Sequence, residues 1–176
     1  PKFNLVIANT PFMKTWAEEM GAKNVIVIPQ GVDTNIMKNL PKDKELQKKY
    51  NINDNDKVVM YLGSILSHSG LDVIFNDMGK ILKEIPEFKL LVVGDGPDLE
   101  RLKQQSKQLG IYEKIIFTGF VPYKEVPRFC SLADLCINPW RINEMTNKLS
   151  PVKIFDFLSC GKSTLATPLD GMLYDF

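Results

Sequence analysis

Short uninterrupted hydrophobic runs alternate along most of the chain with segments whose hydrophobic residues have helical spacing. Three of these runs are Val58–Leu62, Leu90–Val93 and Ile115–Phe117. A continuous hydrophobic run predicts a strand that is buried on both faces, as in a parallel sheet covered by helices. Regular alternation with helical segments predicts βαβ units, and right-handed crossovers between such units give a doubly wound α/β domain with a parallel sheet.

The same pattern predicts the individual elements. In the first part we expect a strand at 4–9 and a helix at 11–20, which begins with Thr10 as N-cap and Pro11 and stops at Gly21. A second strand at 24–28 and a turn at 29–31 follow. Residues 34–56 are expected to be a polar connection with one short helix near 43–50. After that, strands and helices alternate at 57–62, 70–85, 88–93, 98–109, 114–118, 124–132, 134–138, 151–159 and 163–167.

Ligands bind at the carboxyl ends of the strands in a sheet of this kind. Three of the first four strands of the regular part end in glycine, at Gly63, Gly94 and Gly119. Glycine permits a sharp turn and a close approach of a ligand to the backbone, although a single glycine there is also typical of an ordinary strand-to-helix turn. Neither a Walker loop nor a complete dinucleotide fingerprint is present.

A more specific pattern begins at Ser150. Serine followed by Pro151 is typical of a helix start, and the free amides of the first helical turn can hold a phosphate. Lys153 lies in that turn, where its charge opposes the helix dipole and so favours an anionic partner. Asp156 follows three residues later on the same face. The alternative interpretation is a simple Lys153–Asp156 salt bridge on an exposed helix.

Composition narrows the class of protein. The 176 residues are 44% hydrophobic, enough for a domain with a core, and the net charge of +1 indicates neither nucleic-acid binding nor general membrane binding. Cys130, Cys136 and Cys160 match no zinc or redox spacing, which predicts reduced thiols near the core and a cytoplasmic setting. One histidine excludes a multi-histidine metal site, and no hydrophobic run is long enough to span a membrane.

Five segments, in order, resemble motifs of family 4 glycosyltransferases. Residues Leu149–Thr167, LSPVKIFDFLSCGKSTLAT, resemble the signature S-P-x-K-x-x-E-Y-x-A-x-G-K-P-V-x-A-T. Val27–Asp33 is similar to the motif V-I-P-N-G-V-D, and Val92–Pro97 with Leu102 is similar to V-G-x-G-P-x-x-x-x-L. Phe117–Val121 is similar to F-x-G-x-V, and Ala133–Pro139 is similar to A-D-x-x-x-x-P. Five ordered matches are far more specific than any one of them.

The resemblance implies one half of a GT-B fold, in which two Rossmann-like domains face each other across a cleft. Residues 32–176 would be the nucleotide-sugar-binding domain, truncated before its final helices, and residues 1–31 a remnant of the N-terminal acceptor domain and the hinge. The chain begins at Pro1 and ends at Phe176, just after a strand and a turn, so we expect a fragment of a longer protein that is inactive alone.

The activity implied is that of a retaining, metal-independent transferase without a cofactor. It would move a hexose from a nucleotide-diphosphate sugar to a glycan or lipid-linked acceptor, as in polysaccharide biosynthesis. The acceptor and any catalytic base would belong to the N-terminal domain, so no catalytic residue is assigned here. No nucleic-acid partner is expected, and the full-length protein would be cytoplasmic, with peripheral association at the cytoplasmic face of the membrane as an option.

The resemblance also assigns donor contacts. Asp156 would hold the ribose hydroxyls, and the backbone near Gly119 and Val121 would meet the base. The diphosphate and sugar would lie against the glycine-rich strand ends and the start of the last helix, at Gly63, Gly94, Ser150, Pro151, Val152 and Lys153.

Three positions depart from the family pattern. Ser64 and Ser69 stand where arginine and lysine of G-R-x-x-x-x-K-G would neutralise the diphosphate. Because charge-assisted hydrogen bonds are about twice as strong as neutral ones, donor binding should be weaker, or positive charge should come from Lys153, His68 or Arg141. The others are Lys148 for the first glutamate of E-x7-E, which puts a sugar contact in doubt, and Ser163 for proline, a mild change.

Two alternatives follow. The serines motivate a catalytically silent paralogue that still binds a nucleotide sugar. A GT-B epimerase or an unrelated Rossmann-type binder ranks last, because those proteins lack the S-P-x-K segment.

Overall fold

The computed structural model describes residues 3–173 and 175. The expectation about the chain ends depends on residues that lie outside the described ones, namely Pro1, Lys2, Tyr174 and Phe176. The strands are β1 Val6–Ala8, β2 Val25–Val27, β3 Lys57–Leu62, β4 Phe88–Val93, β5 Ile115–Gly119, β6 Leu135–Asn138 and β7 Thr164–Ala166. The α-helices are α1 Pro11–Glu19, α2 Lys44–Lys49, α3 Leu71–Glu84, α4 Leu99–Gln108, α5 Val126–Cys130 and α6 Val152–Ser159. Short 3-10 turns are η1 Tyr112–Lys114, η2 Tyr123–Glu125 and η3 Thr146–Lys148.

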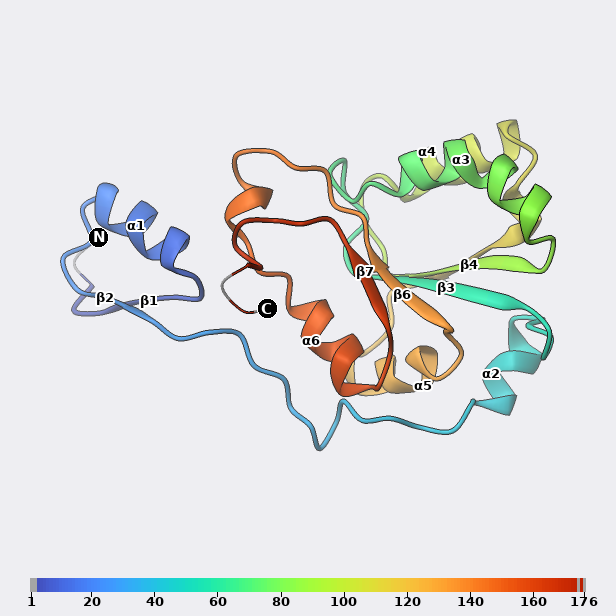
Figure 1. Cartoon of the computed structure of the whole chain (residues 1–176), viewed down its shortest axis with the longest axis horizontal. Helices are drawn as coiled ribbons and strands as arrows, with labels where there is room; N and C mark the ends of the chain where they lie inside the picture. Colours follow the sequence, from blue (N-terminus) through green and yellow to red (C-terminus); the bar gives the residue numbers. More distant parts are fainter. Residues whose placement is uncertain (1–2, 174, 176) are drawn as a thin grey trace.

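The larger sheet has five parallel strands in the order β5-β4-β3-β6-β7 (Figure 1). The central strand β3 pairs with β4 along its whole length, from Lys57 opposite Phe88 to Leu62 opposite Val93. The predicted doubly wound, Rossmann-like α/β fold with a parallel sheet is therefore confirmed.

Helices cover both faces of this sheet, which explains the uninterrupted hydrophobic runs (Figure 1). On one face, α3 and α4 pack on β3, β4 and β5 through Phe75, Leu102 and Leu90. On the other face α2, α5 and α6 pack through a second cluster that includes Phe129 and Phe157. All three cysteines are free and buried, as predicted, and they belong to this second cluster.

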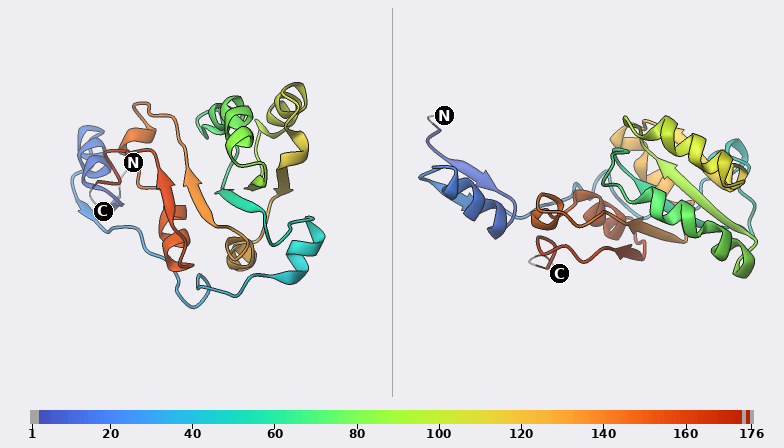
Figure 2. Two further views of the ribbon diagram at one scale, coloured as in Figure 1. Left: turned by 45° about the vertical axis from the view of Figure 1, so that its right-hand side comes forward. Right: turned by 90° about the horizontal axis from the view of Figure 1, so that it is seen from above.

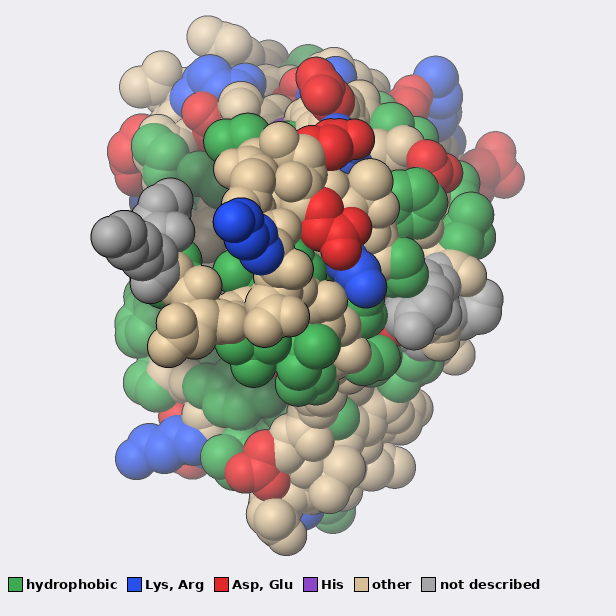
Figure 3. All heavy atoms as spheres, turned by 90° about the vertical axis from the view of Figure 1, so that its left-hand side faces the viewer, with side chains coloured by type: hydrophobic (Ala, Val, Ile, Leu, Met, Phe, Trp, Pro, Cys, Tyr) green, Lys and Arg blue, Asp and Glu red, His purple; other side chains and the backbone are tan. Residues whose placement is uncertain are grey.

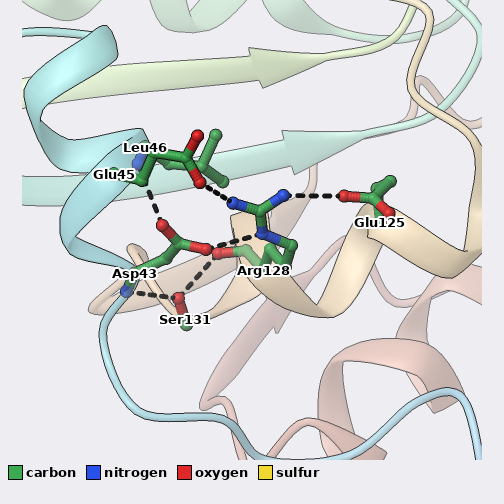
Figure 4. Close-up of polar contacts among 6 residues, drawn as sticks. All are labelled: Asp43, Glu45, Leu46, Glu125, Arg128 and Ser131. Carbon is green, nitrogen blue, oxygen red and sulfur yellow. Dashed lines mark hydrogen bonds and ion pairs between the residues drawn. The ribbon is translucent and has the colours of Figure 1, made fainter.

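Arg128 joins α2 to α5 on that second face (Figure 4). Its guanidinium group bonds Asp43, Glu125 and Glu45 at 2.6, 3.0 and 2.7 Å. Asp43 is also the N-cap of α2, where its carboxylate accepts a hydrogen bond from the Leu46 amide. The predicted short helix is thus confirmed, and the Arg128 cluster fixes the backbone of η2 and α5 through Glu125.

β1, α1 and β2 form a small separate unit with two parallel strands at one end of the molecule (Figure 2). Thr10 caps α1 as predicted, because its hydroxyl accepts a hydrogen bond from Met13 N at 3.1 Å. The same hydroxyl donates to the Lys148 carbonyl at 3.2 Å and ties α1 to the larger part. Hydrophobic side chains are exposed at this end of the molecule (Figure 3), among them Phe12, Trp16 and Met20. The assignment of this unit to a separate domain stays a prediction.

The predicted turn at residues 29–31 is wrong, since this segment runs without a turn toward residue 34. Gly31 also lacks the positive φ that is typical of many glycine turns. Among the described residues, no helix combines the length and the hydrophobicity needed to cross a membrane.

Candidate functional site

The strand order places a topological switch point between β3 and β6. From β3 the chain proceeds outward to β4 and β5, then returns to β6 on the other side of β3. Crossovers on either side of such a point cover opposite faces of the sheet, so the carboxyl ends of the two strands diverge into a crevice for a ligand. Gly63 and Ser64 follow β3 at this point, and Pro139 and Trp140 follow β6.

The three glycines at the strand ends pack backbone against backbone. Gly63 N donates to the Val93 carbonyl at 2.9 Å, and Gly94 N donates to the Gly119 carbonyl at 3.0 Å. A Cβ atom on Gly94 would lie 2.0 Å from the Gly63 oxygen, and Gly94 has a φ of +141°. Glycine is therefore required at Gly94 by the fold, whether or not a ligand binds.

These strand ends line a cavity of about 190 Å³. Gly63, Ser64, Gly94 and Val121 of the predicted site line it, and it is completed by Leu62, Val93, Asp95 and Phe120. The Phe120 side chain is 78% exposed, so an aromatic face stands free at the entrance. The structure thus brings four of the predicted residues to one cavity at the carboxyl edge of the sheet.

Lys153 extends from the first turn of α6 toward the same edge. Its ammonium group lies over the rings of Tyr61 and Trp140, 4.5 and 4.9 Å from their centroids. A Cβ atom on Gly63 would stand 2.7 Å from this nitrogen, so the missing side chain at Gly63 makes room for it. Burial lowers the pKa of Lys153 to about 7, because water is replaced by aromatic surface around the charge.

The Lys153–Asp156 salt bridge that we considered is not present among the described ion pairs. Lys153 turns to Tyr61 and Trp140, whereas the Asp156 carboxylate accepts a hydrogen bond of 2.9 Å from the Tyr123 hydroxyl. Asp156 is only 4% exposed. Burial raises its pKa, and the hydrogen bond from Tyr123 acts in the opposite direction. Burial and the neighbouring carboxylate raise the pKa of Tyr123 to about 12.

The expected N-cap role of Ser150 is wrong. Pro151, with extended backbone angles, is the N-cap of α6, and the helix begins at Val152 without a side-chain cap. The reason is that the Ser150 hydroxyl donates to the Asp175 carboxylate instead. The start of α6 thus has no side-chain cap, and its Ile154 amide donates to the Pro151 carbonyl at 3.1 Å.

The two serines that stand in place of the family's basic residues lie in different environments. Ser64 is exposed at the cavity, whereas Ser69 is buried in the turn before α3 and does not line the cavity. Arg141 bonds the Asp72 carboxylate, and His68 packs edge-on against Trp140 with ring centroids 5.4 Å apart. Of the three candidate sources of positive charge, Lys153 is the one that faces Gly63.

Sequence reasoning missed the aromatic residues of the site, which are Tyr61, Trp140, Phe120 and Tyr123. Trp140 follows a strand end and Phe120 follows Gly119, so their positions carried a signal. The contact between Tyr123 and Asp156 joins residues 33 positions apart, and no signal in the sequence indicated it. Among the described residues, no group of three or more His, Cys, Asp and Glu is arranged to hold a metal ion.

A larger cavity, of about 400 Å³, lies between α1 and the loop before α6. Met13, Trp16, Met145 and Leu149 make it mainly apolar. Its lining includes neither the strand-end glycines nor Lys153. We therefore place the candidate site at the smaller cavity.

Comparison with known proteins identifies the family. The family described as "Glycosyl transferases group 1" matches residues 42–174. The chain is 30% identical over 115 residues, 65% of its length, to the GDP-mannose-dependent alpha-(1-6)-phosphatidylinositol monomannoside mannosyltransferase of Mycolicibacterium smegmatis, and covers 30% of that protein. It is 35% identical over 95 residues, 54% of its length, to the alpha-monoglucosyldiacylglycerol synthase of Streptococcus pneumoniae, and covers 22% of that protein.

Solved structures show the same fold. Anabaena HepE, solved in complex with UDP and glucose, matches 97% of the chain with a TM-score of 0.80 and 24% identity, and the match covers 46% of HepE. WaaG, a glycosyltransferase involved in lipopolysaccharide biosynthesis, matches 96% of the chain with a TM-score of 0.74 and 16% identity, and 45% of WaaG is covered. The chain spans less than half the length of these relatives. The Rossmann-like half of a GT-B fold and the family match of residues 42–174 lead to one conclusion, that the chain belongs to the glycosyl transferases group 1 family.

Proposed function

We propose that the chain is the nucleotide-sugar-binding part of a retaining, metal-independent family 4 glycosyltransferase. The full-length protein would transfer a hexose from a nucleotide-diphosphate sugar to a glycan or lipid-linked acceptor. The observation that carries this proposal is the Lys153 ammonium group, held over two aromatic rings beside Gly63 at the switch point of the sheet. A cation beside backbone that lacks a side chain suits a diphosphate.

The arrangement supports the departure of a nucleoside diphosphate. Bond cleavage at the anomeric carbon passes through an oxocarbenium-like state while negative charge grows on the leaving phosphate. The amides of the first turn of α6 and the Lys153 ammonium group would stabilise that charge. Asp156 would accept hydrogen bonds from the ribose, and the backbone at Gly119 and Val121 would contact the base, with Phe120 at the entrance.

Names of the relatives support the substrate class. HepE was solved with UDP and with UDP-glucose, and the mycobacterial relative is named for its dependence on GDP-mannose. The names of that relative and of the pneumococcal one contain a phosphatidylinositol monomannoside and a monoglucosyldiacylglycerol, which favours a lipid-linked acceptor. The acceptor would be held by the N-terminal domain of the full-length protein.

A panel of nucleotide sugars tests donor binding directly. UDP-glucose, GDP-mannose and related donors are added to the chain, and the melting temperature is measured by thermal shift. We expect at least one donor to raise it, because a ligand that binds only the folded state stabilises that state by mass action. If no donor raises it at millimolar concentration, nucleotide-sugar binding is contradicted.

Replacing Asp156 by asparagine should weaken binding of the selected donor about fivefold. The reason is that a hydrogen bond to a charged acceptor contributes roughly 1 kcal/mol more than one to a neutral acceptor. Isothermal titration calorimetry measures the change, and Asp77→Asn, on the exposed part of α3, is the matched control. Equal affinities of the Asp156→Asn variant and the parent chain would exclude the ribose role.

A catalytically silent, nucleotide-sugar-binding paralogue is the second candidate. It is favoured by Ser64 and Ser69 in place of two basic residues, and by the engagement of Arg141 with Asp72. Turnover of a radiolabelled donor by the full-length protein decides between the two. Donor binding without transfer or hydrolysis would favour the silent form.

A further inference from the structure

The Asp156 carboxylate is under-supplied with hydrogen-bond donors. Among the described residues, one side chain donates to it, the Tyr123 hydroxyl at 2.9 Å from Oδ1, although Asp156 is only 4% exposed. A buried carboxylate with a single neutral donor is poorly compensated for its lost water, and two ligand hydroxyl groups would satisfy it better. Because so little of Asp156 is exposed, a diol that pairs with both carboxylate oxygens has to take the place of the phenol hydroxyl on Oδ1.

Tyr123 reaches Asp156 from a fixed backbone but with a free side chain. It is the first residue of η2, whose last residue, Glu125, is held by Arg128 at 3.0 Å (Figure 4). Its side chain belongs to the exposed large residues, with 44% of the residue accessible to solvent. A rotation of this side chain would therefore release Asp156 at the loss of one hydrogen bond and little packing.

We infer that Tyr123 is an intramolecular competitor for the nucleotide, because its hydroxyl occupies the carboxylate that a ribose diol would use and is displaced when that diol binds. This inference rests on the proposed function. The ligand class is a ribonucleoside diphosphate or its sugar conjugate, whose two adjacent hydroxyl groups replace one phenol on Asp156.

The competition has a consequence for selectivity. A ribose diol gains two hydrogen bonds to Asp156 and displaces one, so binding proceeds with a net gain. A nucleotide without either hydroxyl leaves Asp156 to Tyr123 and gains nothing there. Tyr123 thus lowers the affinity for the ribonucleotide and leaves the affinity for the dideoxynucleotide unchanged.

The Tyr123→Phe variant tests this directly, because it removes the competing hydroxyl and keeps the ring. Uridine diphosphate and guanosine diphosphate, each with its 2′,3′-dideoxy analogue, are titrated calorimetrically into the parent chain and the variant. We expect the variant to bind the ribonucleotide that the parent binds about 5- to 10-fold more tightly, the equivalent of one released hydrogen bond to a carboxylate. Affinity for the dideoxy analogue stays the same.

Two variants serve as controls. Tyr112→Phe changes a tyrosine whose described contacts are made by its ring, with Phe117 and Lys107, and should leave both affinities as they are. In an Asp156→Asn background, Tyr123→Phe should lose most of its effect, since the two residues act through one contact.

The outcomes separate this inference from the proposed function. A parent chain that prefers the ribonucleotide, combined with a Tyr123→Phe variant of equal or weaker affinity, overturns the competitor role alone. Weaker binding would make Tyr123 a ligand contact instead. Failure of the parent to bind any of the four nucleotides overturns the proposed function together with this inference.

Discussion

Replacing Gly94 by alanine should lower the free energy of unfolding by about 2–4 kcal/mol, from backbone strain and steric overlap together. The added Cβ would lie 2.0 Å from the Gly63 oxygen and 2.9 Å from its carbonyl carbon. Both atoms belong to the backbone of the neighbouring strand end, so relief requires β3 and β4 to separate where they line the cavity. The φ of +141° at Gly94 adds strain for any residue with a side chain.

Urea unfolding of the parent and variant chains measures this loss. Gly110→Ala is the matched control, because Gly110 also has a positive φ, +68°, but its added Cβ would meet no atom within 4 Å. The control should lose only about 1–2 kcal/mol, the cost of a left-handed conformation for a residue with a side chain. Equal losses in the two variants would show that the strand ends adapt to the added methyl group.

Gly94 also illustrates how much of this fold the sequence predicts. Runs such as Leu90–Val93 are buried on both faces, so hydrophobicity alone locates the strands, and a glycine marks where each of three strands ends. The parallel arrangement follows from alternation with helices. Helix starts are less certain, because Ser150 has the sequence of an N-cap and yet bonds Asp175, which is distant in the sequence. Long-range polar partners override local preference there.

The sequence likewise predicts one part of the candidate site and not the other. Gly63, Gly94 and Val121 could be placed at one edge from strand order, and the structure puts all three at one cavity. The contact partners of Lys153 and Asp156 could not be predicted from the sequence, because these contacts depend on how α6 packs over the sheet. Tyr61 is the penultimate residue of the central strand β3, and its ring faces Lys153 only after β3 and α6 have packed together.

Replacing Lys153 by methionine should weaken binding of a nucleotide sugar by roughly 10- to 100-fold, since a hydrogen bond to a charged group contributes about 1.5–3 kcal/mol. Methionine keeps the length and the apolar contact with Tyr61 and Trp140. Lys107→Met is the matched control, because its ammonium group also lies over a tyrosine ring, 5.1 Å from the Tyr112 centroid, on the distant helix α4. Calorimetric titration that shows unchanged affinity would exclude a phosphate contact by Lys153.

The pH dependence of binding gives the same residue a second signature. The pKa of Lys153 is lowered to about 7, so the unliganded chain loses this charge as the pH rises above 7. Only the ammonium form attracts a diphosphate, and binding must therefore take up a proton at alkaline pH. Affinity should be constant below pH 7 and fall by up to about tenfold for each pH unit above it, by proton linkage, until the pKa of the complex is reached. The Lys153→Met variant should show no such fall.

Folding stability should show the opposite trend. Because the pKa of Lys153 is lower in the folded chain than the ordinary value of 10.5, the unfolded chain binds more protons between about pH 7 and 10.5. The contribution of Lys153 to stability therefore rises with pH across this window and is fully unfavourable below it. Tyr61 stays neutral there, since burial raises its pKa to about 12. Urea unfolding of the Lys153→Met variant across this window should show that this rise of stability with pH is removed. A charge that disfavours folding at neutral pH but favours an anionic ligand is typical of a binding site.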